Sequence, residues 1–253
     1  MDDILVDLAA GRISVEDARL ALAQGAILNV EGIGRLDAHR DARTGIPEII
    51  LAEGKRPADT AAIVKRLLEA RGEVLVSRLA SDAYAASGLS HLPGVELNYD
   101  EDARFLIVRR TGRPRPETKG VVGIITGGTS DLPVAKEAAL TAEALGVRTV
   151  LKIDCGVAAP QRLYPALREI LAEKPGALIV AAGREGTLAT IVSALVPVPV
   201  IGLPVSTGYG AGGAGQAALT AMLQSCSPLA VVNIDAGVVA GAMAGRIARL
   251  SAR

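Results

Sequence analysis

Five short, mostly apolar runs recur through the second half of the chain, and helix-like segments separate them. The runs span residues 121–126, 149–153, 177–181, 198–203 and 230–234. Strands without alternating polar residues are typical of a parallel sheet that helices cover on both faces. The pattern therefore predicts an α/β fold for residues 120–253, built on a doubly wound, flavodoxin-like parallel sheet.

The segments between these runs carry signals for helix starts and ends. Ser130 or Asp131 can cap a helix that tolerates Pro133 in its first turn and ends at Gly146. Each apolar run is thus followed by its own crossover helix, as a parallel sheet requires. The remaining helices are expected after Pro160, from Thr187, over 216–224 and up to Leu250.

The first half of the chain is less regular. A helix is expected over 13–22, with Ser14 as its cap, and an amphipathic helix over 58–70. The pattern predicts a smaller α/β domain over residues 1–115. Its candidate strands are 47–52, 73–77 and 105–109.

A polar segment separates the two halves. Residues 109–119 contain two Pro, one Gly and five basic side chains, with no apolar residue. Nothing in this segment can join a hydrophobic core, so we expect it to link the domain over 1–115 to the domain over 120–253.

Composition narrows the classes of partner. The 253 residues carry 27 basic and 27 acidic side chains, and the aromatic residues are four Tyr and one Phe. A chain without net charge and with few aromatic rings is poorly suited to nucleic acids. The apolar stretch 190–205 contains three Pro, and the acidic start lacks the layout of a signal peptide. We therefore expect no nucleic-acid or membrane partner and a cytoplasmic location.

The loops that follow the predicted strands are the first places to look for chemistry. Ligands of an open parallel sheet bind outside the carboxyl ends of its strands. Glycine lets backbone N–H groups approach an anion, and a helix N-terminus favours negative charge, so a phosphate-bearing ligand is one interpretation. The other is that glycine is common in such turns whatever they bind. The loops are 126–131, 154–156, 182–186, 204–215 and 235–237.

A glycine pattern in the fourth loop suggests a rival function. Residues 208–213 satisfy GxGxxG, and Asp235 follows at the end of the next predicted strand. This spacing is typical of dinucleotide-binding dehydrogenases. However, residues 204–207 separate the strand from the first Gly, where that motif has an immediate tight turn.

Three side chains could carry covalent or proton-transfer chemistry. Glu185 lies between two Gly after an apolar strand, and a partly buried carboxylate there could move a proton. It could equally be a solvated loop acid. Cys155 and Cys226 stand 71 positions apart with no CxxC pair, so neither a zinc site nor any other metal site can be named. Most cytosolic Cys are small buried hydrophobic residues, so spacing alone favours that interpretation of both thiols.

Several loops also resemble those of a known family. Residues 127–131, Gly-Gly-Thr-Ser-Asp, are similar to the phosphate- and ribose-binding turn of aminoimidazole ribonucleotide carboxylases and mutases. Residues 181–188 and 199–205 resemble the second Gly loop and the next strand of those enzymes. The whole chain resembles the LarB-type carboxylase/hydrolase of nickel-pincer nucleotide cofactor biosynthesis. The further supporting segments are 44–48, 206–211, Ser225-Cys226 and 232–235.

The resemblance implies a reaction. LarB-type enzymes carboxylate the pyridinium ring of nicotinic acid adenine dinucleotide and cleave its phosphoanhydride, releasing AMP and pyridinium-3,5-biscarboxylate mononucleotide. It also implies CO2 or bicarbonate as co-substrate, Mg²⁺ at the phosphoanhydride, and a homo-oligomer, because the related carboxylases form octamers. Cys226 would be the nucleophile and Glu185 the proton-transfer residue. The residues expected to bind substrate are Gly128, Thr129, Ser130, Asp131, Asp154, Arg162, Gly183, Gly186 and Asp235.

The chain departs from the family pattern at a few positions. Gln161-Arg162 stands where related sequences usually carry a His-Arg pair, and the last loop, Asp235-Ala236-Gly237-Val238, lacks an expected Asn and Phe. Arg162 can still pair with an anion, but glutamine cannot shuttle a proton. Two alternatives therefore stay open: a purine-pathway aminoimidazole ribonucleotide carboxylase or mutase, and a dinucleotide-binding protein without this catalysis.

Overall fold

The computed structural model describes residues 2–25 and 27–252, which divide into two compact units. One unit comprises residues 1–99 and 106–113, and the other comprises residues 100–105 and 114–253. Each unit has a hydrophobic core of its own. Within the described residues, the helices are too short or too polar to serve as a membrane span.

The C-terminal unit is built on a five-stranded parallel sheet with the order β11-β10-β9-β7-β8, so the predicted flavodoxin-like sheet is confirmed. Residues of β9 and β10 are buried along the full length of both strands, because helices cover both faces. This burial explains why the strands appear in the sequence as unbroken apolar runs. The strands are β7 (Val121–Thr126), β8 (Arg148–Lys152), β9 (Ala177–Ala182), β10 (Val200–Pro204) and β11 (Ala230–Val231).

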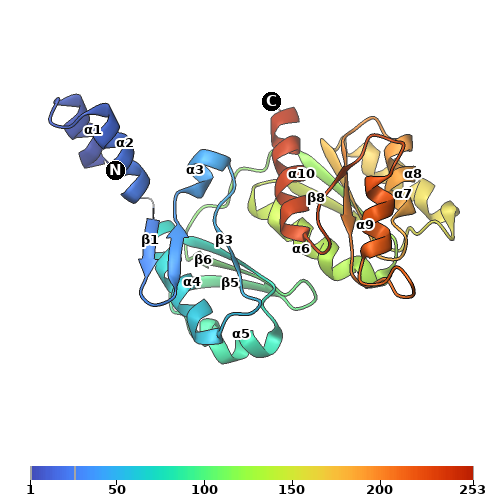
Figure 1. The fold of residues 1–253 in the computed structure, drawn as a ribbon, viewed down its shortest axis with the longest axis horizontal. Helices are drawn as coiled ribbons and strands as arrows, with labels where there is room; N and C mark the ends of the chain where they lie inside the picture. Colours follow the sequence, from blue (N-terminus) through green and yellow to red (C-terminus); the bar gives the residue numbers. More distant parts are fainter. Residues whose placement is uncertain (1, 26, 253) are drawn as a thin grey trace. The chain divides into compact units, whose positions relative to one another are not determined.

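Helices form the two outer layers of this unit (Figure 1). Helices α6 (Leu132–Ala144) and α10 (Gly237–Ser251) share one core with the sheet, and most of their buried side chains are Ala. Their backbones approach closely: a Cβ on Gly241 would lie 2.2 Å from the carbonyl oxygen of Ala138. The core on the opposite face contains side chains from α7 (Pro160–Ala172), α8 (Thr187–Leu195) and α9 (Gln216–Leu223).

The N-terminal unit contains a mixed four-stranded sheet with the order β3-β4-β6-β5. Strands β3 and β4 are parallel, β4 and β6 are antiparallel, and α4 packs on the sheet through Val64 and Leu67. A separate antiparallel hairpin joins β1 to β2. The strands are β1 (Ile27–Val30), β2 (Gly34–Asp37), β3 (Ile49–Leu51), β4 (Glu73–Ser77), β5 (Val95–Asp100) and β6 (Phe105–Arg110). The helices are α1 (Asp2–Ala9), α2 (Val15–Gly25), α3 (Arg40–Thr44), α4 (Pro57–Arg71) and α5 (Ser81–Ser87).

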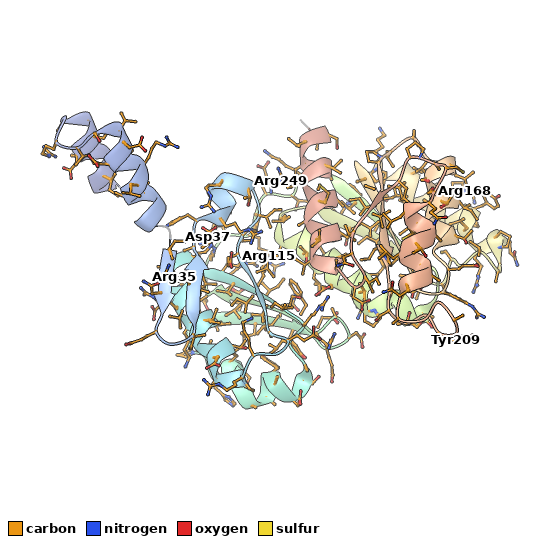
Figure 2. All side chains as sticks on the ribbon, in the orientation of Figure 1. Arg35, Asp37, Arg115, Arg168, Tyr209 and Arg249 are labelled. Carbon is orange, nitrogen blue, oxygen red and sulfur yellow. The ribbon has the colours of Figure 1, made fainter. Side chains whose placement is uncertain are left out.

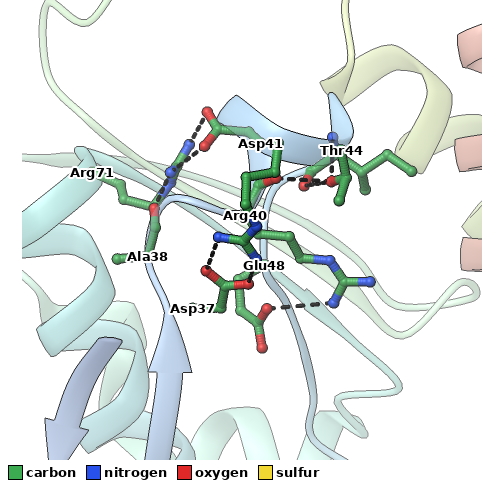
Figure 3. A network of polar contacts seen from close by, with 9 residues as sticks. Asp37, Ala38, Arg40, Asp41, Thr44, Glu48 and Arg71 are labelled. Atoms are coloured by element: carbon green, nitrogen blue, oxygen red, sulfur yellow. Dashed lines mark hydrogen bonds and ion pairs between the residues drawn. The ribbon is translucent and has the colours of Figure 1, made fainter. Parts of the chain in front are cut away.

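A network of ion pairs holds the segment between β2 and β3 (Figure 3). Arg71, at the end of α4, binds both carboxylate oxygens of Asp41 and the carbonyl of Ala38. Arg43 binds Asp37, and the Arg40 guanidinium lies 3.4 Å from Glu48. Bidentate arginine–carboxylate pairs fix direction as well as distance, so this short segment has a defined conformation despite its many polar residues.

Some predicted boundaries are wrong for identifiable reasons. The first two residues of the expected linker, Arg109 and Arg110, belong to β6, where Arg109 stands opposite Glu73 and forms an ion pair with it. A cross-strand ion pair lets a polar residue extend a strand beyond its apolar run. Strand β11 is two residues long, so 232–234 lie outside the sheet although they were expected to belong to the strand. The hairpin of β1 and β2 escaped prediction because each of its strands has only four residues, too few for a repeating pattern to stand out.

Candidate active site

A pocket of about 310 Å³ lies at the carboxyl edge of the five-stranded sheet. Its walls come from the loops after β7, β8, β9 and β10, around the point where the strand order reverses between β7 and β9. Sheets of this topology bind ligands at that point, and the volume is that of a small-molecule site. The predicted site residues in its lining are Gly128, Ser130, Asp131, Arg162, Gly183, Glu185 and Gly186. Those outside the lining are Thr129, Asp154, Cys226 and Asp235.

Glycines let the loops of the pocket pack against one another. A Cβ on Gly183 would lie 2.5 Å from Thr207 Oγ1 and 2.9 Å from the carbonyl oxygen of Val205. A Cβ on Gly208 would lie 2.2 Å from the carbonyl oxygen of Gly183. Real side chains do not tolerate such distances, so the loops after β9 and β10 need glycine in order to touch. The close packing gives the pocket a firm backbone wall.

Asp131 is the buried carboxylate in this wall. Its Oδ2 accepts a 2.8 Å hydrogen bond from the Gly128 amide, and its Oδ1 accepts a 2.9 Å bond from Thr207 Oγ1. The side chain is 4% exposed, and burial raises the pKa of the carboxyl group, while the bonds from Gly128, Thr207 and the Gly183 amide oppose that rise. Asp131 therefore joins the first, third and fourth loops of the sheet edge.

The neighbouring residues of the first loop differ in position. Ser130 lines the pocket beside the N-terminal end of α6, where backbone N–H groups and the helix dipole favour an anion. Thr129 is exposed and does not line the pocket. Within the predicted turn 127–131, the structure thus offers Ser130 and the backbone, rather than Thr129, to a ligand.

The loop after β8 contributes a basic group. Arg162, on the first turn of α7, lines the pocket and forms an ion pair with Asp154. Asp154 itself has a positive φ of 57°, and its amide donates a 3.0 Å hydrogen bond to Thr126 Oγ1. Asp154 therefore orients Arg162, whose other N–H groups remain able to bind an anion in the pocket.

Glu185 and Gly186 complete the third loop. Glu185 lines the pocket and is exposed, and no hydrogen bond or ion pair of its carboxylate is found among the described residues. Gly186 has a φ of 71°, and a Cβ there would lie 2.6 Å from the carbonyl oxygen of Ala218. Gly186 thus allows α8 to start directly against α9, which places Glu185 at the pocket mouth.

Arg184 and Tyr209 meet across the third and fourth loops. Arg184 Nη1 donates a 2.7 Å hydrogen bond to the Tyr209 hydroxyl, and its guanidinium carbon lies 4.7 Å from the centre of the tyrosine ring. Both residues line the pocket, and Tyr209 is 71% exposed. The contact combines a hydrogen bond with a cation–π interaction.

Asp235 acts on the fourth loop rather than on the pocket. Its Oδ1 accepts a 2.9 Å hydrogen bond from the Ser206 amide, and its own amide donates to the carbonyl of Pro204. Asp235 has a positive φ of 55°. It thus fixes the first residue after the buried Val205, and it lies outside the pocket lining although the resemblance assigned it to substrate binding.

Cys226 lies at the other edge of the sheet. The strands are parallel and the pocket follows their last residues, whereas Cys226 precedes β11, whose Ala230 pairs with Ile201 near the start of β10. The two edges are roughly 15 Å apart, because β10 has five residues that each rise about 3.3 Å. The prediction that Cys226 and Glu185 share one crevice is therefore wrong within a single copy of the chain. The thiol is exposed.

The second thiol has a different environment. Cys155 is 3% exposed and packs in the core with Leu163 and Leu167, and burial raises the pKa of its thiol. A buried thiol with a raised pKa is a packing residue rather than a nucleophile.

The carboxylates of the pocket can contact a metal ion that is bound to the substrate, but they cannot hold an ion by themselves. Among residues 2–25 and 27–252, no group of three or more His, Cys, Asp or Glu side chains is placed to hold an ion. Both oxygens of Asp131 already accept hydrogen bonds, whereas the carboxylate of Glu185 has no partner among the described residues. The donor set therefore does not fit a resident, protein-held ion, but it fits an Mg²⁺ that arrives on substrate phosphates and needs a single carboxylate.

Sequence reasoning missed Arg184, Thr207 and Tyr209. All three line the pocket, and they lie in loops 182–186 and 204–215, which the sequence had marked as sheet-edge loops. Their position in loops at the carboxyl edge of the sheet is the sequence feature that could have identified them, because ligands of this topology bind at that edge.

Both halves of the chain match family models. Residues 121–253 match the AIR carboxylase model, and residues 28–110 match the LarB/PurE-like N-terminal domain. An uncharacterized protein of Methanocaldococcus jannaschii is 35% identical over 251 residues, covering 98% of this chain and 96% of that protein. The N5-carboxyaminoimidazole ribonucleotide mutase of Pyrococcus horikoshii is 36% identical over 131 residues, covering 51% of this chain and 72% of the mutase.

A third relative matches over a length similar to that of the mutase. The phosphoribosylaminoimidazole carboxylase of Schizosaccharomyces pombe is 33% identical over 132 residues, which cover 52% of this chain and 24% of that enzyme. The mutase and the carboxylase each match about half of this chain, whereas the Methanocaldococcus protein matches over both units. The chain belongs to the LarB-type family, in which a LarB/PurE-like N-terminal domain precedes an AIR carboxylase domain.

Proposed function

We propose that the protein carboxylates the pyridinium ring of nicotinic acid adenine dinucleotide and hydrolyses its phosphoanhydride, releasing AMP and pyridinium-3,5-biscarboxylate mononucleotide. One observation carries the proposal. In a chain whose two halves match the LarB-type pattern, Glu185, Arg162 and the backbone of several Gly-rich loops face one pocket. An acid–base group and an anion-binding group are what a reaction on a phosphorylated pyridinium requires.

The pocket has separate groups for the charged parts of this substrate. The N-terminal end of α6, together with Ser130, favours a phosphate. Arg162 can bind a second anion through the N–H groups that Asp154 leaves free. The Asp131 carboxylate, held by three donors, can still accept a hydrogen bond from a ribose hydroxyl.

The carboxylation needs a nucleophile because a pyridinium ring is electron-poor. A thiolate that adds to the ring forms a C–S bond and leaves a dihydropyridine, whose enamine carbon attacks CO2. A base, for which we propose Glu185, then removes the proton from the carboxylated carbon. The ring regains aromaticity as the C–S bond breaks and the thiolate leaves, so the step consumes CO2, releases one proton and needs no oxidant.

The position of Cys226 makes this covalent route depend on assembly. In one copy the thiol lies at the amino edge of the sheet, and Glu185 lies at the carboxyl edge. We therefore propose a homo-oligomer in which Cys226 of one copy reaches the pocket of another. The exposure of the thiol supports this arrangement, because a buried thiol could not enter a second copy.

The hydrolytic half requires water at the phosphoanhydride and a stabilised leaving phosphate. A magnesium ion on the substrate phosphates would neutralise charge there, and Glu185 is the pocket residue that would contact it. Arg162 would bind the adjoining phosphate oxygens. Water adds to phosphorus as the P–O–P bond breaks, and AMP leaves.

The test is a product assay. The full chain is incubated with nicotinic acid adenine dinucleotide, bicarbonate and Mg²⁺, and mass spectrometry is used to look for AMP and the ring-carboxylated mononucleotide. Finding neither would overturn the proposal. Binding of the dinucleotide without turnover would instead favour a binding protein. If Cys226→Ala keeps full turnover, the covalent route is wrong but the substrate assignment stands.

A second candidate is the reaction named for the Pyrococcus mutase, which is favoured by the identity over 131 residues. The same protein should therefore be assayed with N5-carboxyaminoimidazole ribonucleotide. Conversion of that compound, without reaction of the dinucleotide, would place the protein in the purine pathway.

A further inference from the structure

Tyr209 is the aromatic residue of the pocket lining, and its side chain is largely exposed. The chain has five aromatic residues. Tyr84 and Tyr99 stack on each other in the N-terminal unit, Phe105 is buried, and Tyr164 is exposed on α7 outside the pocket. Tyr209 is 71% exposed in the loop between β10 and α9 (Figure 2). The pocket thus offers one aromatic face to a ligand.

A planar cation already occupies that face. The Arg184 guanidinium carbon lies 4.7 Å from the ring centre, and Nη1 donates a 2.7 Å bond to the hydroxyl. Among the described residues, Arg184 forms no ion pair with a carboxylate, although it adjoins Glu185. The guanidinium of Arg184 is therefore stabilised by the tyrosine ring and not by a carboxylate.

The backbone that carries Tyr209 is fixed at its base. Thr207 is bonded to Asp131, Asp235 holds the Ser206 amide, and Gly208 packs against the carbonyl of Gly183. These contacts end one residue before Tyr209, so the ring is presented from an anchored turn. Preorganised aromatic groups bind at a lower entropic cost than mobile ones.

We propose that Tyr209 is the stacking platform for a cationic heteroaromatic ring of the ligand, and that Arg184 leaves the platform to bind an acidic group of that ligand. A pyridinium, like a guanidinium, is flat and delocalises a single positive charge, so the same tyrosine face attracts both. The displaced guanidinium presents a rigid fork of donors that matches a carboxylate. The ligand class is a pyridinium bearing an acidic substituent, and this inference rests on the proposed function.

The test compares ring charge with the sugar phosphate held constant. Nicotinamide mononucleotide has a cationic ring, and its reduced form has a neutral one. Dissociation constants are measured by calorimetry for the full chain and for Tyr209→Leu, Tyr209→Phe and the matched control Tyr164→Leu. Loss of the ring should weaken binding of the cationic form about tenfold, while Tyr209→Phe and Tyr164→Leu stay within about threefold. The reduced form should bind the wild-type chain more weakly and respond less to Tyr209→Leu.

The role of Arg184 is tested by changing the acidic group. Arg184→Gln should weaken nicotinic acid mononucleotide, which has a ring carboxylate, at least about fivefold more than the amide analogue. Equal binding of the cationic mononucleotide to wild type and Tyr209→Leu overturns the inference, and so does failure of both mononucleotides to bind. If the wild-type chain still releases AMP from the dinucleotide in either case, the proposed function survives. If it does not, both fail.

Discussion

Thr207 Oγ1 donates a 2.9 Å hydrogen bond to Asp131 Oδ1, joining residues that are 76 positions apart in the chain. The bond connects the loop after β10 to the start of α6, and both residues line the pocket. The two residues do not belong to a common sequence motif. The pocket therefore forms only when β7 and β10 are both part of the folded sheet.

Removing this bond should loosen the fourth loop. Thr207→Val keeps the shape of the side chain but leaves Asp131 without one donor, so we expect the free energy of unfolding to fall by about 1–2 kcal/mol. Urea denaturation measures the change. Thr220→Val is a matched control, because Thr220 Oγ1 donates only to backbone carbonyls of its own helix, those of Gln216 and Ala217. Equal stabilities of the two variants would contradict a tethering role for Thr207.

Asp131 should make stability depend on pH in an unusual direction. Burial raises the pKa of its carboxyl group above the ordinary value of 3.8, so the folded protein binds a proton at a pH where the unfolded chain does not. As pH falls through the window between the raised pKa and 3.8, this residue's contribution to stability should increase. Above that window the contribution is constant and unfavourable.

The measurement is the difference in free energy of unfolding between wild type and Asp131→Asn, followed from neutral pH down to the ordinary carboxyl pKa of 3.8. The difference should shift in favour of wild type as the pH falls, because the asparagine does not titrate. A shift in favour of the variant over the same window would mean that the hydrogen bonds from Gly128, Thr207 and Gly183 outweigh burial.

The close packing of the third and fourth loops makes Gly183 intolerant of a side chain. A Cβ there would meet Thr207 Oγ1 at 2.5 Å and Asp131 Oδ1 at 3.0 Å. We expect Gly183→Ala to cost about 1–3 kcal/mol of stability and to lower ligand affinity, since the clash pushes the loops apart. Gly34→Ala is the control, because a Cβ at Gly34 would have no described atom within 4 Å beyond its chain neighbours. If both variants unfold at the same urea concentration, the packing argument is wrong.

The parallel sheet could be predicted from sequence because β9 and β10 are buried on both faces. Such strands are apolar along their whole length, so each can be recognised from its own residues without knowing which strand pairs with it. The same pattern predicted that Gly183 and Glu185 would lie near Asp131, since all three follow strands at one edge. Tyr209 and Arg184 could not be paired in this way. Their contact depends on the path of a loop that is fixed by Asp131 and not by local propensity.

Cys226 shows the opposite limit. The family resemblance suggested that Cys226 is the nucleophile, but it did not say where in the fold the thiol lies. The chain order already placed Cys226 before a strand and Glu185 after one, and in a parallel sheet these positions lie at opposite edges. A prediction that combined the resemblance with this rule would have required a second copy of the chain.

The two thiols should differ sharply in reactivity. Cys155 is buried and the pKa of its thiol is raised, so it should resist alkylation until the chain unfolds. Cys226 is exposed in the single chain. If it enters the pocket of another copy, saturating nicotinamide mononucleotide should slow its alkylation, which mass spectrometry of the labelled peptides detects. Unchanged labelling of Cys226 with ligand, in an assembly shown by light scattering, would contradict that placement.

Complementation between two inactive variants tests the shared site directly. Cys226→Ala keeps an intact pocket, and Glu185→Gln keeps an intact thiol, so each should be inactive alone if both groups are needed. In a mixed assembly, a pocket from one variant can meet a thiol from the other, and equal random mixing should restore about a quarter of wild-type product formation. The control is Cys226→Ala mixed with a Cys226→Ala, Glu185→Gln double variant, which supplies no thiol. Mixed assemblies that stay as inactive as this control would show that each chain must use its own Cys226, and the proposed transfer of the thiol between copies would be wrong.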